Sequence, residues 1–274
     1  MTTEALKRPH FHRPPIFEQA ITLGFERLAQ LEIVDHGLFW ATLRDQFPDS
    51  ETGPRITTPV EIFDGTETQI LMSAAPSLQL PRAIFRNDTK GEIVQVQDDT
   101  FVFNWIANGL NNEYPRFERT SARLWELFGK FSEFYQQRHG VLPQLRHCEI
   151  TNVNVIPVAD FGESYDDMSK AFVVDPFEWE VPGLEAETYV RRRLHRILDE
   201  RGRSVGRLHS VISPTRDQSD QDAFQFELTA RSVPNIHNRI AAEDFFARAH
   251  SMINGAFLAS VQPAMREVWR EYDG

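Results

Sequence analysis

Apolar and polar residues alternate along several stretches of the chain, a pattern typical of β-strands that are buried on one face. In residues 16–25 the alternation places on one face Phe17, Ile21, Leu23 and Phe25. In residues 224–232 it is cleanest, with Phe224, Phe226, Leu228 and Ala230 alternating with polar neighbours. Further strands are predicted at residues 68–74, 82–86, 92–105, 148–158, 189–198 and 203–213.

Apolar residues at helical spacing predict three helices. The first covers residues 36–47, with Asp35 as its N-cap. The second covers residues 116–138, and its apolar face, which is predicted to pack on the sheet, contains Phe117, Leu124, Phe128 and Phe131. The third begins near Ala241 and is ended or kinked by Pro263, because proline removes a backbone hydrogen bond and clashes with the preceding turn.

These elements occur in the same order twice: a strand, a loop or helix, three strands and a long helix. We therefore expect an α+β fold of two similar halves, each an antiparallel sheet backed by a long helix. The two sheets are either separate or continuous. Residues 1–13 are predicted to be a flexible tail, residues 14–142 the first half and residues 143–274 the second, packed together as one globular unit.

The overall composition is that of an ordinary globular protein, with 41% hydrophobic residues and a formal net charge of −11. Such an acidic surface repels nucleic acid in general, although a local basic patch would still bind it. The single cysteine, Cys148, cannot form an intramolecular disulfide, which favours a reducing compartment. Because the chain has no apolar run of membrane-spanning length and no apolar leader, we predict a cytoplasmic protein that does not enter the membrane.

Several stretches together resemble a sporadically distributed family of uncharacterised bacterial proteins of about this length. The stretches are PPIFEQAITLGF, FWATLRDQFP, VQVQDDTFVFNW, YPRFERTSARLWELFGKF and EITNVNVIP. Where members of the family tend to carry Tyr-x-Asn in the strand near mid-chain, this sequence has Asn152 and Asn154. The resemblance implies one co-inherited unit and supplies no activity.

Residues 189–209 contain seven of the arginines and two histidines but only two acidic residues, in a chain that is otherwise strongly acidic. If strands 189–198 and 203–213 form a hairpin in which odd-numbered residues share a face, that face is cationic. Strand 224–232 adds to it one further arginine and Glu227. The resulting candidate binding residues are Arg191, Arg193, His195, Arg203, Arg207, His209 and Arg231.

This pattern has several interpretations. The first is a non-enzymatic binding or adaptor protein, whose guanidinium groups receive an acidic protein partner or a nucleic acid. An alternative is an enzyme for a phosphorylated or carboxylated small molecule, with His195 or His209 as general acid or base. A further alternative is a structural subunit that buries the patch in a homodimer. The simplest interpretation is pairing of the arginines with Glu227 and with the acidic loops 160–167 and 178–187.

Other residue patterns carry weaker signals. Trp105 and Tyr114 lie on either side of the passage from a strand to a helix. They are interpreted either as an aromatic platform for a ligand ring or as ordinary core residues. His10 and His12 form an H-x-H pair, but no second cluster has metal-ligand spacing, so we predict no metal site. No glycine-rich nucleotide loop or nucleophile motif occurs, so no cofactor or catalytic residue is predicted.

Overall fold

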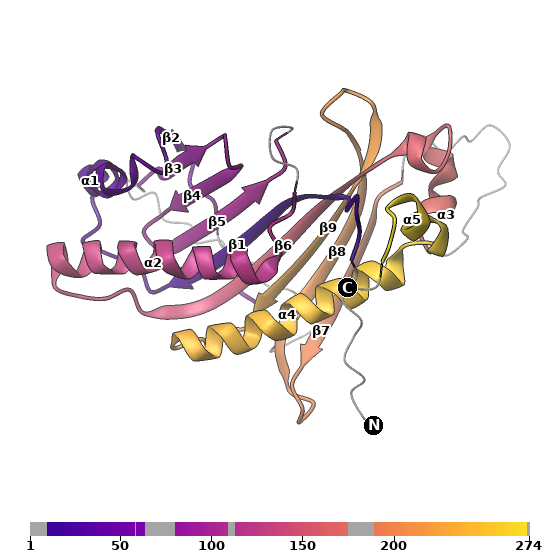
Figure 1. The fold of residues 1–274 in the computed structure, drawn as a ribbon. Coiled ribbons are helices and arrows are strands. Elements are labelled where there is room, and N and C mark those ends of the chain that lie inside the picture. Colours follow the sequence, from indigo (N-terminus) through magenta and orange to yellow (C-terminus); the bar gives the residue numbers. More distant parts are fainter. Residues whose placement is uncertain (1–9, 58, 64–79, 109–112, 175–188, 273–274) are drawn as a thin grey trace, which may run out of the picture.

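The computed structural model describes residues 10–57, 59–63, 80–108, 113–174 and 189–272. Its centre is one sheet, in which the described residues form nine strands in the order β2-β3-β4-β5-β1-β6-β9-β8-β7 (Figure 1). Every neighbouring pair is antiparallel. The strands are β1 Ile16–Phe25, β2 Asp49–Gly53, β3 Arg82–Asn87, β4 Glu92–Val96, β5 Thr100–Ile106, β6 Leu145–Pro157, β7 Arg191–Leu198, β8 Ser204–Arg216 and β9 Asp222–Ser232.

The sheet runs without interruption through the centre of the molecule. β1 pairs with β5 on one side and with β6 on the other, and the pair Ile21 and Ile150 joins the two parts of the chain. Of the two arrangements considered from the sequence, the structure therefore has the continuous sheet. The α+β fold class is confirmed.

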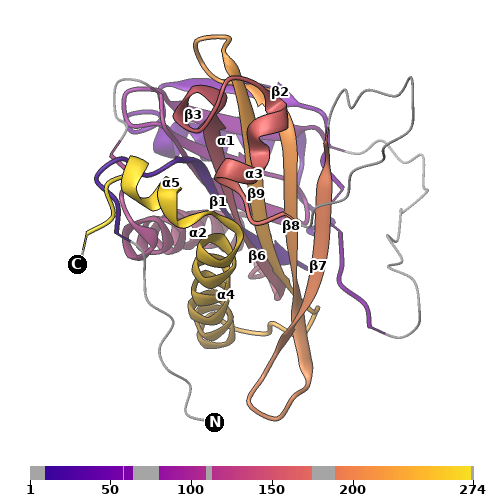
Figure 2. The same ribbon diagram turned by 90° about the vertical axis from the view of Figure 1, so that its right-hand side faces the viewer.

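Two long helices cover one face of this sheet (Figures 1 and 2). They are α2 Phe117–His139, which contacts β1 and β5, and α4 Arg239–Ser260, which contacts β6, β8 and β9. Shorter helices are α1 Ile33–Leu43, α3 Met168–Ala171 and α5 Pro263–Val268, with 3₁₀ turns at Val158–Asp160 and Tyr165–Asp167. Among the described residues, no helix covers the opposite face, which we call the open face.

The predicted helix over residues 116–138 is confirmed as α2. It ends at Gly140, whose φ of 76° is the left-handed conformation that glycine adopts without a steric penalty. Leu124, Phe128 and Phe131 are buried against the sheet, and Phe117 is partly buried. The third helix also ends before Pro263, which instead begins α5.

The first helix starts earlier than predicted, and Asp35 is not its N-cap. Glu32 takes that position, and Asp35 at the third helical position completes a capping box by accepting a hydrogen bond from the Glu32 backbone N–H. The Asp35 carboxylate is fully buried and forms ion pairs with Arg138 and His139 at the end of α2. Asp35 thus ties α1 to α2, a long-range role that the local pattern did not show.

The predicted strand over residues 92–105 is two strands, β4 and β5. They turn sharply at residues 97–99, where Gln97 and Thr100 close the turn through a backbone hydrogen bond of 2.8 Å. Apolar residues continue on both sides of this turn, so the pattern reads as one strand. The strand predicted at residues 68–74 lies outside the described residues.

The last residues of the predicted tail are held in place by the C-terminal segment. Phe11 bridges to Glu271, and the His12 and Arg13 N–H groups donate to the carbonyls of Arg270 and Trp269. Residues 10–13 of the predicted tail thus contact the C-terminal segment, while residues 1–9 lie outside the described part. None of the described helices is long and apolar enough to cross a membrane.

Candidate functional site

The predicted cationic face is split by the register of the β7–β8 hairpin. Arg196 pairs with Arg207 and Leu194 with His209, so even-numbered residues of β7 share a face with odd-numbered residues of β8. Arg191, Arg193 and His195 pair instead with Ile212, Ser210 and Leu208, on the face that the helices cover. The assumption that odd-numbered residues share one face was wrong, because a shift of one residue in register turns a whole strand over.

Three of the predicted residues do converge, on the open face. Arg207 and His209 on β8 and Arg231 on β9 all contact the carboxylate of Glu61. The His209 Nε2 lies 2.6 Å from Glu61 Oε1, and Arg231 Nη1 donates to the same oxygen at 2.9 Å. Arg207 forms an ion pair with the other oxygen, and Glu61 is only 2% exposed. We call Glu61, Arg207, His209 and Arg231 the Glu61 cluster.

The cluster holds Glu61 as a carboxylate. Burial alone would raise the pKa of Glu61, but the hydrogen bond from His209 and the charges of His209, Arg231 and Arg207 outweigh burial and lower it. Arg231 also donates to Glu149 on the neighbouring strand β6. The two guanidinium charges therefore face two carboxylates, and the surplus of positive charge expected from the sequence is absent at this point.

Glu61 reaches the cluster on a segment that crosses the open face, which we call the strap (residues 55–57 and 59–63). At one end, Arg55 forms ion pairs with Asp98 and Asp99. The backbone of Ile56 exchanges two hydrogen bonds with the Gln97 side chain, of 2.6 and 3.0 Å. The strap is thus an extended segment fixed to the β4–β5 turn and, through Glu61, to β8 and β9.

An aromatic contact adds to the hold of the strap. The Phe63 ring lies beneath two guanidinium groups, with Arg207 4.6 Å and Arg196 5.4 Å from its centroid. These are cation–π distances. Arg196 on β7 therefore shares this ring with Arg207 on β8. Sequence reasoning missed Glu61 and Phe63 altogether, although the charged residue inside the apolar run VEIF is a local signal.

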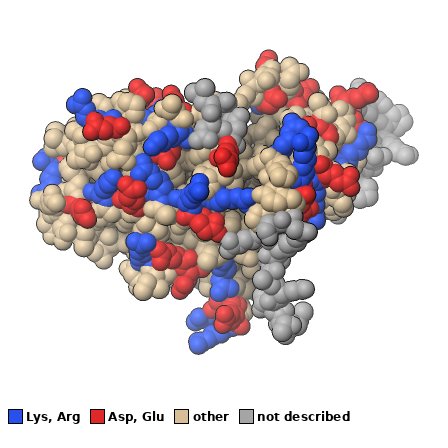
Figure 3. All heavy atoms as spheres, in the orientation of Figure 1, with Lys and Arg blue, Asp and Glu red and all other residues tan. Residues whose placement is uncertain are grey.

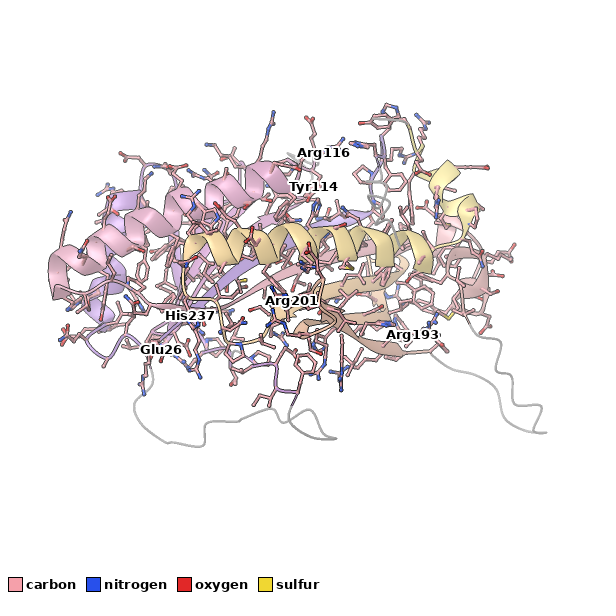
Figure 4. The ribbon with its side chains drawn as sticks, turned by 90° about the horizontal axis from the view of Figure 1, so that it is seen from below. Glu26, Tyr114, Arg116, Arg193, Arg201 and His237 are labelled. Atoms are coloured by element: carbon pink, nitrogen blue, oxygen red, sulfur yellow. The ribbon has the colours of Figure 1, made fainter. Side chains whose placement is uncertain are left out.

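The other predicted residues lie apart from the cluster. Arg203 sits in the β7–β8 turn and pairs with Asp199 at 2.7 Å. Arg191 donates to the carbonyl of Val173, and Arg193 lies on the far side of α4 from Tyr114 (Figure 4). Figure 3 shows basic and acidic side chains side by side over the face with the helices, including the tip of this hairpin at the bottom. On that face no broad basic surface forms.

Of the two aromatic residues Trp105 and Tyr114, the first lies in the core and the second lines a cavity. Their ring centroids are 5.4 Å apart, but Trp105 is 2% exposed and belongs to the core. Tyr114 lines a cavity beside α2 and accepts a hydrogen bond of 2.7 Å from Gln19. The two rings therefore do not form an open platform.

His10 and His12 take part in packing between the chain ends. His10 Nδ1 lies 2.6 Å from Arg116 Nη1, and the His12 ring stacks on Tyr272 at 4.3 Å. Cys148 is fully buried, and burial raises the pKa of its thiol, so it does not form a thiolate at neutral pH. In the part of the chain that the structure describes, no group of three or more His, Cys, Asp or Glu side chains is placed to hold a metal ion.

Comparisons with known proteins give no further guide to this site. No protein family, curated protein or solved structure matches the sequence or the fold at a significant level. The resemblance to the uncharacterised bacterial family stays a prediction, and the interpretation of the Glu61 cluster depends on its own geometry.

Proposed function

We propose that the protein is a binding or adaptor protein whose open face, at Arg207, His209 and Arg231, receives an acidic segment of a partner protein. The observation that carries the proposal is that this face already holds a carboxylate on an extended segment, namely Glu61 on the strap. The strap is then an internal stand-in for the partner. A glutamate or aspartate of the partner replaces Glu61 and takes over the same three contacts.

The chemistry of the cluster favours a carboxylate. Guanidinium groups match carboxylates in planar, charge-assisted geometry, and the His209 ring adds a third donor through Nε2. Removing Glu61 without a replacement would leave Arg207 and Arg231, each with 11% of its side chain exposed, short of one partner charge. Because that state is costly, the strap leaves only when another anion arrives. Binding is therefore an exchange between two carboxylates.

A nucleic acid is the less favoured partner. The strands next to the cluster bring further carboxylates to the open face, among them Glu18, Glu149 and Glu227. Burial raises the pKa of Glu18, and the nearby charge of Glu227 adds to the rise, so negative charge is already crowded there. A chain of phosphates would meet these groups, whereas a single carboxylate side chain meets only the cluster.

The enzyme alternative receives less support from the geometry. It requires His195 and His209 to work among the arginines, but the two lie on opposite faces of the β7–β8 hairpin. His209 is also held by Glu61. A homodimer has one specific observation in its favour: among the described residues β7 has no strand on its outer side, and it carries two exposed leucines, Leu194 and Leu198. Light scattering distinguishes a dimer from a monomer.

We also infer that the sheet consists of two similar halves. In each half the first strand pairs with the last, as β1 does with β5 and β6 with β9. The remaining strands follow outward, and a long helix comes after the last strand. The halves differ in β2 and in the segment after the first strand. The cytoplasm remains the proposed location, because the one cysteine is unpaired and buried.

The exchange is tested by measuring the affinity of a fluorescein-labelled decaglutamate peptide by fluorescence anisotropy. In Glu61→Gln the internal competitor loses its charge, so we expect the peptide to bind about tenfold more tightly than to the wild-type protein. Glu267→Gln is the matched control, because it removes the same charge from an exposed residue of α5. Arg207→Gln should abolish the gain. Weaker or unchanged peptide binding to Glu61→Gln, or preference for a single-stranded oligo-dT over the peptide, contradicts the proposal.

A further inference from the structure

A cavity of about 810 Å³ lies on the other side of the sheet, between the two long helices. Its walls come from the start of α2, the second half of α4 and strands β1, β6 and β9, and it is bordered by residues 10–16 and by Tyr272. Figure 4 shows Tyr114 and Arg116 at the α2 end of this space, beside α4. The volume falls within the range of small-molecule sites.

The floor of the cavity combines apolar side chains with two buried amides. Leu228 on β9 and Ile253 and Phe257 on α4 supply apolar surface. Asn152 and Asn154, 7% and 5% exposed, both point from β6 toward the helices, since alternate residues of a strand share a face. Neutral amides at the bottom of an otherwise apolar cavity are the kind of group that orients a ligand.

Each amide forms a hydrogen bond to the protein through only one of its two polar atoms. Asn152 Oδ1 accepts a hydrogen bond of 2.9 Å from Gln19, and Asn154 Nδ2 donates one of 3.0 Å to the carbonyl of Phe226. Among the described residues, neither the Asn152 NH₂ group nor the Asn154 side-chain oxygen has a hydrogen-bond partner. The cavity floor therefore offers one donor and one acceptor, separated by two residues of strand.

A chain of hydrogen bonds fixes the orientation of these groups. Gln19 donates to both Asn152 and the Tyr114 hydroxyl, and its own oxygen accepts from Thr120 on α2. Burial is the main cause that raises the pKa of Tyr114, which keeps the phenol neutral and able to donate into the cavity. The hydroxyl therefore gives the cavity a second donor, and the three charged residues of its lining, Glu113, Arg116 and Glu118, are exposed.

Charged and aromatic groups lie nearer the rim. Arg116 contacts His10 and donates to the Tyr272 hydroxyl at 3.0 Å, so its charge is directed to the chain ends. His250 stacks on Phe117, with ring centroids 4.3 Å apart and planes 19° from parallel. These flat groups favour a flat ligand over a branched aliphatic one.

We propose that this cavity binds an uncharged heterocyclic small molecule of nucleoside size. The ring edge bonds to the Asn152 NH₂, the Asn154 oxygen and the Tyr114 hydroxyl, and the ring faces lie against Leu228 and Phe257. Amide groups pair with the ring nitrogens and exocyclic amino groups of bases, and here one asparagine would supply the donor and the other the acceptor. The site lies on the opposite side of the sheet from the Glu61 cluster and does not depend on the function proposed for it.

The test is titration calorimetry of the full chain with adenosine, guanosine, cytidine and uridine, and with the monophosphate of each as its charged comparison. We expect one nucleoside to bind, and its nucleotide to bind no more tightly. Asn254→Trp, which projects a large ring from α4 into the cavity, should weaken binding by at least about tenfold. Met252→Trp is the matched control, because Met252 is exposed on the same helix and does not line the cavity.

A second variant keeps the test decisive if Asn254→Trp does not fold. Tyr114→Phe removes only the hydroxyl and should weaken the nucleoside about fivefold, the effect of one lost hydrogen bond. The proposal is overturned if none of the four nucleosides binds at millimolar concentration or if Asn254→Trp and Tyr114→Phe both leave the affinity unchanged. It is also overturned if the nucleotide binds while the nucleoside does not.

Discussion

The His147 imidazole occupies the space where a side chain on Gly24 would begin. The two residues face each other across the β1–β6 pair at the centre of the sheet, and a Cβ atom built on Gly24 would lie 2.0 Å from His147 Cε1. His147 is 4% exposed, and neither of its ring nitrogens has a hydrogen-bond partner in the described structure. Glycine at position 24 therefore makes room for a buried ring.

Gly24→Ala should destabilise the protein by about 2 kcal/mol, because the added methyl group overpacks a rigid site. In a His147→Ala background the same change should be neutral or slightly stabilising, since alanine suits a strand better than glycine does. Urea unfolding of the four proteins measures both effects. Equal costs of Gly24→Ala in the two backgrounds would show that the ring does not occupy this space.

His147 should also make stability depend on pH. Burial, with the positive charges of Arg231 and Arg146 nearby, lowers the pKa of His147 to about 4 from its ordinary 6.5. Between pH 6.5 and pH 4, His147 is protonated in the unfolded chain but not in the folded protein, so stability is lost as the pH falls through this window. The complete loss amounts to about 3 kcal/mol.

The measurement compares urea unfolding of the wild-type protein and of His147→Leu at pH 7 and pH 4.5. The wild-type protein should lose about 2 kcal/mol more than the variant on acidification, because leucine does not titrate. Carboxylates elsewhere titrate in both proteins and cancel in the difference. The same loss in both would mean that His147 titrates normally.

Phe128→Ala should destabilise the protein by about 4 kcal/mol. The ring of Phe128 on α2 lies against Phe101, with centroids 5.6 Å apart, and also contacts Phe25 and Phe131. Its loss leaves a cavity between the helix and the sheet. Phe134→Ala, on the same helix but only partly buried, should cost less. A thermal melt of each variant gives the comparison, and a small effect at position 128 would mean that the site collapses after substitution.

The sequence predicts well those elements whose burial is a local property. α2 and β9 follow their apolar periodicity to within two residues, because one face of each packs on the core along its whole length. β7 lacks that guide: of its eight residues only Ile197 is buried, so nothing in RRRLHRIL fixes its register. The placement of Arg191, Arg193 and His195 failed for this reason.

The Glu61 cluster could not be predicted because its contacts are long-range. Glu61 lies 146 residues from Arg207 and 170 from Arg231, in a segment without periodicity. The sequence indicated that Arg207, His209 and Arg231 would share one face of the sheet, and they do. The carboxylate that neutralises these residues, Glu61, is brought to them only by tertiary folding. The count of charges along the chain therefore overstated the free positive surface.

The strength of this cluster is measurable by a double-mutant cycle on Glu61 and Arg207. Glu61→Gln and Arg207→Gln should each cost about 3 kcal/mol, because each leaves a charge in a nearly closed site without its partner. Together they should cost about 2 kcal/mol less than the sum, since the second change removes the charge that the first left unpaired.

The matched control is the cycle on Arg239 and Glu243, an ion pair of 2.7 Å on α4 with both side chains largely exposed. Its coupling should stay below about 1 kcal/mol and should disappear at high salt, whereas that of Glu61 and Arg207 should persist. If both cycles gave the same small, salt-sensitive coupling, then Glu61 would be solvated in solution, and the strap would not hold the place of an acidic partner.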